Sequence, residues 1–480
     1  MGVKVMNEIL NLLVEIKNEE NLERVQIKLE QKIKTTQKMN IEEYILFAMI
    51  KFKKKEFEEC LKILNQAEEI DTYHFGVNLL KACTLDSIKK HNEANNIFIK
   101  SMIIAPNNEI RKKILEIFSE RYPELKMVES FLNKVINGEI KILHGTMEIA
   151  NQMYTYTSGL KKYGAYARSI NYYPSYLKYK NDMVINYHQL QKPFIESLIK
   201  DYSLFHFHFG TSLLPDNSDL PFLKSIKKYL LMQYWGSEAR RISLVKKFNP
   251  YAISKITEES EIEKKLYYIS KYINNAIVED LELYECIKEF HNKIHFVRQA
   301  IDINKYNLND LDDNILENKE NIHKKKIRIV HAPTNPEFKG TKYIVNAIEN
   351  LKIKHNNNIE FILISGVSHD EAKKIYQSAD IIVDQLHAGV YGLFAIESMA
   401  LGKPVVGWIA DYFLKSYPKE LPIIRANPDS IEKVLEELIK NREILPEIGM
   451  NSRKYVEKYH NIEKIKFDLL MLYYKIYREE

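Results

Sequence analysis

Residues 384–408 are the part of this sequence that most restricts the fold. An apolar segment at 381–383 stops at a glycine-containing loop, and an apolar stretch with helical spacing follows at 393–401. Gly402 ends that stretch, and a second apolar segment at 404–409 begins two residues later. The order strand, glycine loop, helix and strand predicts a parallel sheet whose strands are joined by helical crossovers.

The same run predicts a nucleotide site. Backbone amides of the loop and the first turn of the following helix form a site that favours phosphate. Glu397 lies within LFAIESMALG, where burying a carboxylate is costly unless hydrogen-bond donors reach it. The two vicinal hydroxyls of a ribose are suitable donors. The simpler alternative is a glutamate that faces solvent.

Strands alternate with helices through most of the chain, which predicts an α/β fold class with ligands beyond the carboxyl ends of the strands. In the second half, strands are expected at 327–332, 360–365, 380–384 and 404–409, and helices at 343–354, 370–378 and 393–401. In the first half, strands are expected at 141–145, 166–173 and within 204–215, 228–241 and 294–302, with a helix at 149–163 ended by Gly164. Residues 303–326 are dense in Asn, Asp, Glu and Lys and indicate a linker.

Residues 1–135 are predicted to be entirely helical, because they contain very little glycine or proline and their apolar residues recur at helical spacing. A repeat of about 34 residues aligns two groups of positions. These are Ala48, Cys60, Leu64 and Ala67 in one copy and Ala82, Ala94, Phe98 and Ser101 in the other, and Pro106 closes the second copy. The pattern resembles the tetratricopeptide repeat, which implies a short helical solenoid whose concave side binds a partner. A helical cap that only packs on the rest of the chain is the alternative.

Composition excludes several other classes. Seventy basic and 65 acidic residues leave a formal net charge of only +5, which does not favour nucleic-acid binding. Cys60, Cys83 and Cys286 have no metal or redox spacing, which is typical of a reducing compartment. We expect a cytoplasmic protein without a signal peptide or transmembrane segment, and peripheral membrane contact stays open.

Two runs carry a resemblance to a known family. Residues 384–408 and HAPTNPEFKGT at 331–341 resemble the donor half of the family-4 type, retaining GT-B glycosyltransferases (glycosyl transferases group 1). The family pattern is Glu-x7-Glu followed by alanine, glycine and a Pro-Val strand. The second Glu is Glu397, whereas Gly389 stands at the first position. A subgroup reading DQL-x-x-G-x-YG-x-x-A-x-E-x-MA-x-GKPV is more similar to this chain.

The resemblance implies a GT-B architecture, in which two Rossmann-like domains face a cleft. The helical domain would be residues 1–135, the acceptor domain 138–302, the linker 303–326 and the donor domain 327–480, whose last helix crosses back to the first domain. Within the donor domain, the resemblance assigns Lys339, beside Gly340, to the diphosphate charge and Glu397 to the ribose. The backbone amides of Gly389, Val390, Tyr391 and Gly392 would contact the diphosphate and the sugar.

Several positions depart from the family or allow a second interpretation. An arginine usual just upstream of the lysine is missing, since residues 334–336 are Thr, Asn and Pro. An ordinary solvated lysine is the alternative for Lys339. With no glutamate at position 389, Asp384 or His387 are candidates for the sugar contact.

In the acceptor domain, Gly145 and Thr146 would form the glycine loop near the leaving phosphate. His208 in HFHFG resembles the family's HxH element and is the catalytic candidate there, with His206 on the same face of the strand. Both histidines are expected either in the cleft or in a packed interior. Glu238, Arg240 and Arg241 are further candidates for acceptor or phosphate contacts.

The expected function is hexosyl transfer from a UDP- or GDP-sugar to an acceptor hydroxyl, with retention and without a metal. No permanently bound cofactor is expected, and the Asp-x-Asp pattern at 310–312 falls in the linker. A glycan, a lipid-linked sugar and a protein are all open as acceptor, and the solenoid favours a protein or peptide. The alternatives are a catalytically degenerate GT-B subunit that serves as a scaffold, and a GT-B sugar epimerase.

Overall fold

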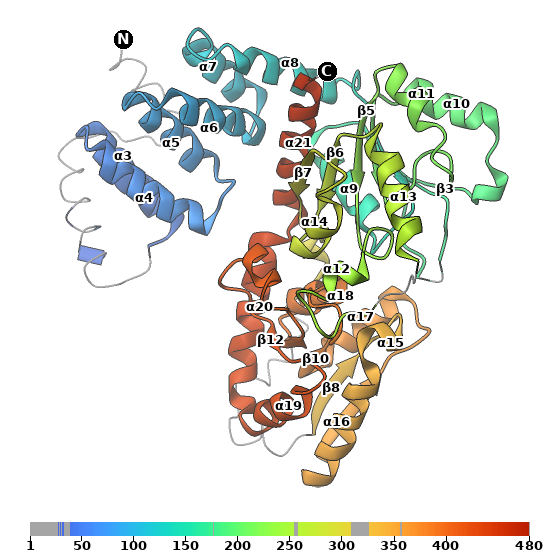
Figure 1. Ribbon diagram of the computed structural model, residues 1–480. Coiled ribbons are helices and arrows are strands. Elements are labelled where there is room, and N and C mark those ends of the chain that lie inside the picture. Colours follow the sequence, from blue (N-terminus) through green and yellow to red (C-terminus); the bar gives the residue numbers. More distant parts are fainter. Residues whose placement is uncertain are drawn as a thin grey trace. The chain divides into compact units, whose positions relative to one another are not determined.

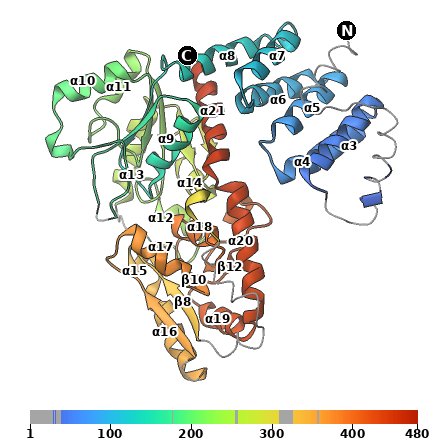
Figure 2. The same ribbon diagram turned by 180° about the vertical axis from the view of Figure 1, so that it is seen from behind.

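The structure is a computed structural model of the chain, and it describes residues 27, 29, 31–32, 39–175, 177–253, 258–308, 326–355 and 358–479. The chain divides into two compact units. One unit is helical and contains Met1–Val135 together with Phe467–Glu479, and the other is an α/β unit that contains Ile136–Lys466. Figures 1 and 2 show the helices and strands of each unit from two sides.

The helical unit is built from consecutive antiparallel helices, as the repeat predicts. They are α3 (Ile41–Lys53), α4 (Phe57–Ile70), α5 (Phe75–Ser87), α6 (His91–Ile104), α7 (Asn108–Phe118) and α8 (Glu124–Ile136). All eight positions that the repeat aligns are fully buried, with 0% of their surface exposed. The tetratricopeptide-like helical region is therefore confirmed for the described helices. The flanking helical pair expected at 1–40 lies largely outside the described residues.

Small residues let the helices of this unit approach closely. The Cys60 thiol of α4 donates to the carbonyl of Ala48 in α3 over 3.2 Å. The end of α21 (Ile462–Glu479) also packs in this unit, where the Tyr474 hydroxyl donates to Glu124 over 3.1 Å. The ring of Phe131 lies 5.3 Å from the ring of Tyr477. The last thirteen residues of that helix thus complete the helical unit rather than the α/β unit.

The first sheet of the α/β unit has seven parallel strands in the order β3-β2-β1-β4-β5-β6-β7. The strands are β1 (Ile142–Thr146), β2 (Ala167–Asn171), β3 (Met183–Val184), β4 (Leu204–His208), β5 (Tyr229–Gln233), β6 (Asn275–Val278) and β7 (Lys293–Phe296). Their connections contain α9 (Gln152–Tyr163), α10 (Lys192–Asp201), α11 (Leu220–Ser225), α12 (Ile242–Val245), α13 (Glu259–Ser270) and α14 (Leu281–Ile287). Gly164 ends α9 in the left-handed conformation, with φ of 105°.

The second sheet has five parallel strands in the order β12-β11-β10-β8-β9. They are β8 (Ile327–His331), β9 (Ile359–Leu363), β10 (Ile381–Val383), β11 (Val405–Gly407) and β12 (Ile424–Arg425). The helices are α15 (Pro336–Lys339), α16 (Thr341–Lys354), α17 (His369–Gln377), α18 (Leu393–Ala400), α19 (Ile431–Lys440) and α20 (Leu445–Tyr459). Two Rossmann-like sheets preceded by a helical region form the expected GT-B architecture.

The two Rossmann-like domains share one apolar core. Phe205 and Phe207 of β4 belong to the same buried cluster as Val390 and Phe413 of the second domain. Alternation of β4 side chains explains this, because its phenylalanines face the core while its histidines face the other side of the sheet. The loops of the second domain are thereby fixed against the first.

Some elements differ from the sequence expectations. β1 continues through Gly145 and Thr146, so these two residues end the strand and the loop begins at Met147. The short strands β3, β6 and β12 were not expected, because two to four residues carry too little periodicity to be recognised. In the expected linker, Ile303 and Tyr306 are buried, and residues 309–325 lie outside the described part.

Across the described part of the chain, every helix is either too short or too polar to serve as a membrane span.

Candidate functional site

The predicted site residues gather at the carboxyl edges of the two sheets, where the strand order reverses. In the first sheet this point lies between β1 and β4, and in the second sheet between β8 and β10. Crossovers that leave in opposite directions open a crevice there, which is the usual ligand position in open α/β sheets. Thr146 and His208 end β1 and β4, while His331 ends β8 and Asp384 follows β10.

Lys339 is held at the carboxyl edge of the second sheet. Its ammonium nitrogen lies 2.7 Å from Asp384 Oδ1 and 2.7 Å from Gln385 Oε1. Gly340, with φ of 73°, turns the chain from α15 into α16 directly behind it. Lys339 is therefore a fixed, paired cation rather than a solvated one. A diphosphate in this place would meet an ion pair.

The positions upstream of Lys339 form the capped start of α15. Asn335 Oδ1 accepts from the backbone N–H of Phe338 over 2.8 Å, and Pro336 takes the first helical position. These residues shape the helix and bring no positive charge. The family arginine therefore has no substitute within residues 334–336.

Asp384 offers an unused acceptor beside Lys339. Its side chain is buried, and Oδ2 has no hydrogen-bond partner among the described residues. A buried carboxylate oxygen without a partner is costly unless a ligand supplies a donor. This geometry supports the earlier candidate role of Asp384 as a contact for a sugar hydroxyl.

Glu397 on α18 is buried, with 5% of its surface exposed. Its Oε1 accepts two hydrogen bonds, from the Tyr306 hydroxyl over 2.8 Å and from His369 Nε2 over 2.6 Å. Within the described chain, no side chain or amide donates to Oε2. The hydrogen bond to Glu397 raises the pKa of His369 above its usual value of 6.5. The carboxylate thus faces protein donors on one oxygen and keeps the other for a ligand.

Gly389 adopts a conformation that only glycine adopts readily, with φ of 76°. A Cβ atom added there would lie 2.7 Å from Asn249 Nδ2 and 3.2 Å from Ala410 Cβ. Asn249, which follows β5 in the first domain, donates to the carbonyl of His387 over 2.7 Å and accepts from Trp408 Nε1 over 3.0 Å. The space of the family glutamate is therefore occupied by an asparagine.

The rest of this loop exposes backbone rather than side chains. Val390 is buried in the shared core, and the Tyr391 hydroxyl lies 3.0 Å from both Tyr455 and His460 Nε2. Gly392 precedes the first turn of α18. Over the described ranges, the amides of Val390, Tyr391 and Gly392 have no hydrogen-bond acceptor. Unpaired amides next to a helix N-terminus are the groups that bind phosphate oxygens.

His387 is fixed by the backbone of α15. Its Nδ1 lies 3.0 Å from the carbonyl of Glu337, and burial lowers its pKa. In the neutral ring, Nδ1 then carries the proton and Nε2 is an acceptor. The ring stands beside Gly340, so it borders the same corner as Lys339.

His208 and His206 lie in a packed interior, which is the second of the two expected alternatives. His208 Nε2 is 3.1 Å from His144 Nδ1, and its Nδ1 accepts from Trp235 Nε1 over 3.1 Å. His206 Nε2 is 3.0 Å from Gln233 Oε1. Burial lowers the pKa of His206 to about 3 and that of His208 well below 6.5. These rings are neutral and fully buried.

The fold brings together three histidines that sequence spacing did not connect. One nitrogen from each of His144, His206 and His208 lies within 4.8 Å of the others, a spacing that a metal ion could bridge. The residues come from two neighbouring strands, β1 and β4. The sequence analysis found no metal-like cluster because the strand pairing, and not the spacing along the chain, assembles this one.

The remaining predicted residues of the first domain are engaged with the protein. Thr146 donates to the carbonyl of Ser212 over 3.0 Å, and Gly145 packs against Ile170. Glu238 accepts from the amides of Trp235 and Gly236 over 2.5 and 3.0 Å.

The two arginines that follow Glu238 also have protein partners. Arg240 donates to Glu282 over 2.5 Å, and its guanidinium lies 5.3 Å from the ring of Phe338 in the second domain. Arg241 donates to the carbonyl of Cys286 over 3.1 Å and to Glu289 over 2.8 Å. Both arginines are therefore engaged with protein groups.

Sequence reasoning missed four residues of this region. Tyr306 and His369 hold Glu397, as described above. Glu148 accepts from the amides of Met153 and Tyr154 at the start of α9 over 3.0 and 3.3 Å, and burial raises its pKa to about 8. Lys265 of α13 brings its ammonium to within 3.4 Å of the Cβ position of Gly210, and burial lowers its pKa. No motif marks these four, although a glutamate just ahead of a helix is a recognisable capping signal.

Comparison with known proteins finds a family match within the second domain. Residues 345–455 match the family model of glycosyl transferases group 1. An uncharacterised glycosyltransferase of Methanocaldococcus jannaschii is 28% identical over 125 residues, which are 25% of this chain. The chain spans about a third, 35%, of the length of that relative.

Solved structures with lower similarity cover more of the chain. Sucrose-phosphate synthase from Thermosynechococcus elongatus is 14% identical, with a TM-score of 0.48 over 71% of this chain and 100% of its own. A glycosyltransferase from Rickettsia africae is also 14% identical, with a TM-score of 0.48 over 71% of this chain and 99% of its own. An O-GlcNAc transferase from Thermobaculum terrenum is 7% identical, with a TM-score of 0.39 over 99% of this chain and 98% of its own.

Proposed function

We propose that this chain, which carries a glycosyl transferases group 1 domain, moves a hexose from a nucleotide-sugar donor to an acceptor hydroxyl. The observation that carries the proposal is the carboxyl edge of the second sheet. Glu397 with an uncommitted oxygen, the Lys339–Asp384 pair and the unpaired amides of residues 390–392 border one corner of the α/β unit. We assign them the roles of a ribose acceptor, a phosphate cation and a phosphate cradle, which are the groups that a nucleotide diphosphate requires.

In the proposed reaction, Lys339 and the N-terminus of α18 offset the charge of the diphosphate as it departs. The bond between the anomeric carbon and the diphosphate oxygen breaks, and a bond to the acceptor oxygen forms on the same face of the sugar. The proton of the acceptor hydroxyl passes to the released diphosphate. Retention and independence from a metal are part of the proposal, and the family resemblance supports both.

The donor sugar would be held by Asp384 and His387. Asp384 Oδ2 has no donor among the described residues, and His387 Nε2 is an acceptor in the neutral ring. Both could accept hydrogen bonds from sugar hydroxyls where the family uses a glutamate. The proposed donor is a uridine or guanosine diphosphate sugar.

Donor binding and donor turnover test the proposal together. The full chain is titrated calorimetrically with UDP-glucose, UDP-N-acetylglucosamine and GDP-mannose, and release of the nucleoside diphosphate is then measured without acceptor. We expect one of these donors to bind and to be hydrolysed slowly, and Glu397→Ala to weaken its binding. Absence of both binding and hydrolysis with every donor overturns the proposal.

A catalytically degenerate binding subunit is the second candidate, and three observations favour it. Gly389 leaves no room for the family glutamate, residues 334–336 supply no arginine, and His208 is fully buried. This candidate predicts nucleotide binding without turnover for any donor. The same pair of measurements therefore separates the two functions.

The helical unit is proposed to bind a protein or peptide, either the acceptor or a second transferase. The buried repeat positions support a solenoid, whose concave face is the usual binding surface. A pull-down with the full chain, compared with a chain whose exposed residues on α4 and α6 are changed, tests this role. Identical captured proteins from both chains would contradict it.

A further inference from the structure

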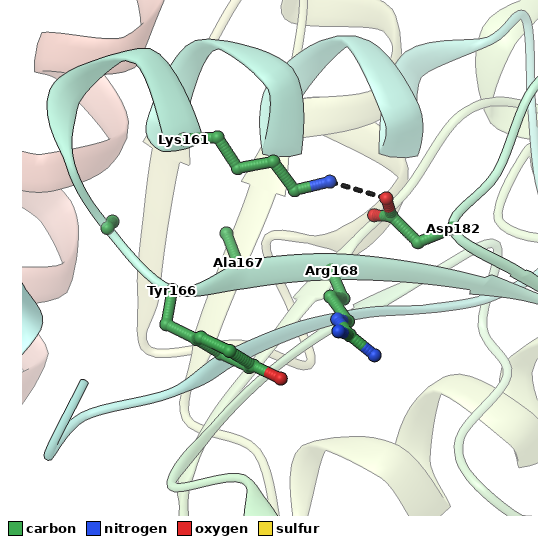
Figure 3. A pocket seen from close by; sticks show the side chains of 6 residues that line it. Lys161, Tyr166, Ala167, Arg168 and Asp182 are labelled. Carbon is green, nitrogen blue, oxygen red and sulfur yellow. Dashed lines mark hydrogen bonds and ion pairs between the residues drawn. The ribbon is translucent and has the colours of Figure 1, made fainter.

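The amino edge of the first sheet, where the strands begin, combines exposed aromatic and cationic side chains. Tyr166 directly precedes β2, and both the Lys141 ammonium and the Arg168 guanidinium stand near its ring, 5.1 and 5.4 Å from the ring centre. Tyr166 and Arg168 border a hollow of about 400 Å³ that Lys161 and Asp182 also line. Figure 3 shows Lys161 reaching Asp182, while Tyr166 and Arg168 point away from that pair.

A second group of the same kind lies further along this edge. Phe222 of α11 and Ile226 just after it are 54% and 40% exposed. Lys224 lies between them in sequence and donates to the carbonyl of Lys271 over 2.9 Å. The Lys271 ammonium in turn lies 4.3 Å from the ring of Tyr267, which is 59% exposed. Large apolar groups and cations therefore alternate here as well.

The two groups belong to one surface. The Tyr166 ring contacts the ring of Tyr202, which precedes β4, at 6.3 Å, and Lys228, which precedes β5, donates to the Tyr202 carbonyl over 2.7 Å. β2 and β5 are three strand spacings apart, about 14 Å. We call the six residues Lys141, Tyr166, Arg168, Phe222, Lys224 and Ile226 the amino-edge surface.

The charges of the amino-edge surface are not neutralised by the protein. No carboxylate of the described residues forms an ion pair with Lys141, Arg168 or Lys224. Asp182 is already paired with Lys161, and Asp201 also lies near Tyr202. Cations without counter-charges beside exposed apolar groups need an anionic partner that also accepts apolar side chains.

We propose that the amino-edge surface docks the protein on an anionic lipid bilayer. Lys141, Arg168 and Lys224 would contact headgroup phosphates, while Phe222 and Ile226 enter the boundary between headgroups and acyl chains. An acidic protein is less suited, because it would satisfy the cations and leave Phe222 and Ile226 exposed. The surface lies at the edge opposite the nucleotide corner, so docking leaves that corner accessible. The inference does not depend on the proposed function.

Vesicle sedimentation of the full chain tests the inference. The vesicles are phosphatidylcholine alone or phosphatidylcholine mixed with phosphatidylglycerol, at low and at high salt. We expect sedimentation only with the mixed vesicles and a decrease at high salt. Arg168→Glu with Lys224→Glu should lower the partition coefficient at least about tenfold, and Phe222→Ser with Ile226→Ser should lower it several-fold.

Matched control substitutions on the second domain distinguish binding through the amino-edge surface from nonspecific binding to vesicles. Ile353 of α16 is 81% exposed and Lys433 of α19 is a solvent-facing cation, so Ile353→Ser and Lys433→Glu should leave sedimentation unchanged. All variants change exposed positions, and their melting temperatures check that they fold. Failure of the unaltered chain to bind mixed vesicles overturns the inference, as does equal loss in the controls. A third outcome would assign the surface to an acidic protein instead. In that outcome the chain binds soluble polyglutamate but not vesicles, and Phe222→Ser with Ile226→Ser leaves the polyglutamate binding unchanged.

Discussion

Glu397 is a buried carboxylate whose orientation is fixed by the fold and which we propose to contact a ligand. Its Oε1 is held by Tyr306 and His369, which orients the side chain before any ligand arrives. Pre-orientation of this kind lowers the cost of binding, because the rotamer is already fixed.

Replacing Glu397 should therefore weaken the donor site more than the fold. Glu397→Ala is expected to lower donor affinity at least about tenfold, because it removes an acceptor for the ribose hydroxyls. It also leaves two protein donors unpaired and should reduce stability by about 1–3 kcal/mol. Calorimetric titration and chemical unfolding measure the two effects, and Glu397→Gln is the isosteric control. Unchanged donor affinity in Glu397→Ala would show that Glu397 is not part of the donor site.

The pair of His369 and Glu397 predicts a pH-dependent contribution to stability. Because the folded pKa of His369 is raised above 6.5, the charged pair stabilises the protein fully below pH 6.5, and this stabilisation is lost as pH rises through the folded pKa. Tyr179, Tyr306, Asp370 and Lys373 also face this pair. Asp370 is the second carboxylate near His369, but its Oδ1 lies 4.0 Å from His369 Nδ1 and its side chain is 98% exposed, so solvent screens it and it contributes less than the buried Glu397.

The difference in unfolding free energy between the unaltered chain and His369→Gln isolates this effect. Gln keeps a donor for Glu397 but does not titrate, and the other buried histidines contribute equally to both proteins. We expect an advantage of about 1 kcal/mol for the unaltered chain at acidic pH and none at alkaline pH. A difference that is constant with pH would contradict the assigned pair.

Gly389 is required by backbone conformation and by space together. Gly389→Ala should lower the free energy of unfolding by about 2–3 kcal/mol. The added methyl group would clash with Asn249 and Ala410, and alanine also disfavours the left-handed φ of this position. Gly366 is a matched control, since its φ is 70° and no atom of the described, non-neighbouring residues lies within 4 Å of the place where a Cβ atom would stand. Gly366→Ala should cost only about 1 kcal/mol. Equal losses of unfolding free energy in the two variants would show that space at position 389 plays no part.

The helical hairpins depend on small residues where helices cross. Ala67→Leu in α4 should destabilise the helical unit by about 1–3 kcal/mol, because Ala67 is fully buried and its neighbours cannot give way freely. Gln66→Leu places the same side chain on the exposed face of the same helix, and a change within about 0.5 kcal/mol is expected. Calorimetric melting of both variants measures the difference. Donor binding by the α/β unit should be unaffected in both.

Elements were predicted well where periodicity is long and poorly where it is short. Helices such as α16 and α18 begin and end within two residues of the expected bounds, because each contains several turns with a clear apolar face. β3, β6 and β12 contain two to four residues and are defined by their pairing partners. β1 runs one residue beyond its expected end, because its pairing with β2 continues through Thr146 and Asn171.

Across the α/β unit, Asn249 joins the first domain to the loop that carries the unpaired amides. Asn249→Ala should lower stability by about 2 kcal/mol, because it removes two part-buried hydrogen bonds, and it should also weaken donor affinity by loosening residues 387–389. Tyr251→Phe is the control, since the Tyr251 hydroxyl also bridges the domains, to Asp429, but at an exposed position. Unfolding curves and donor titration should separate the two variants. If both variants change stability and donor affinity by similar, small amounts, the hydrogen bonds of Asn249 do not hold the loop at residues 387–389 in place.

The sequence by itself determined the alternation of strands and helices and the parallel sheets, and it predicted the place of the proposed nucleotide site. These follow from local signals, because hydrophobic periodicity reports which face of a segment is buried and glycine reports where the backbone turns. Only the tertiary structure decided the partners of the polar groups. Tyr306 and His369 reach Glu397, Asn249 fills the space beside Gly389, and three histidines meet across β1 and β4. Packing of distant segments sets these contacts, and a periodic pattern carries no information about it.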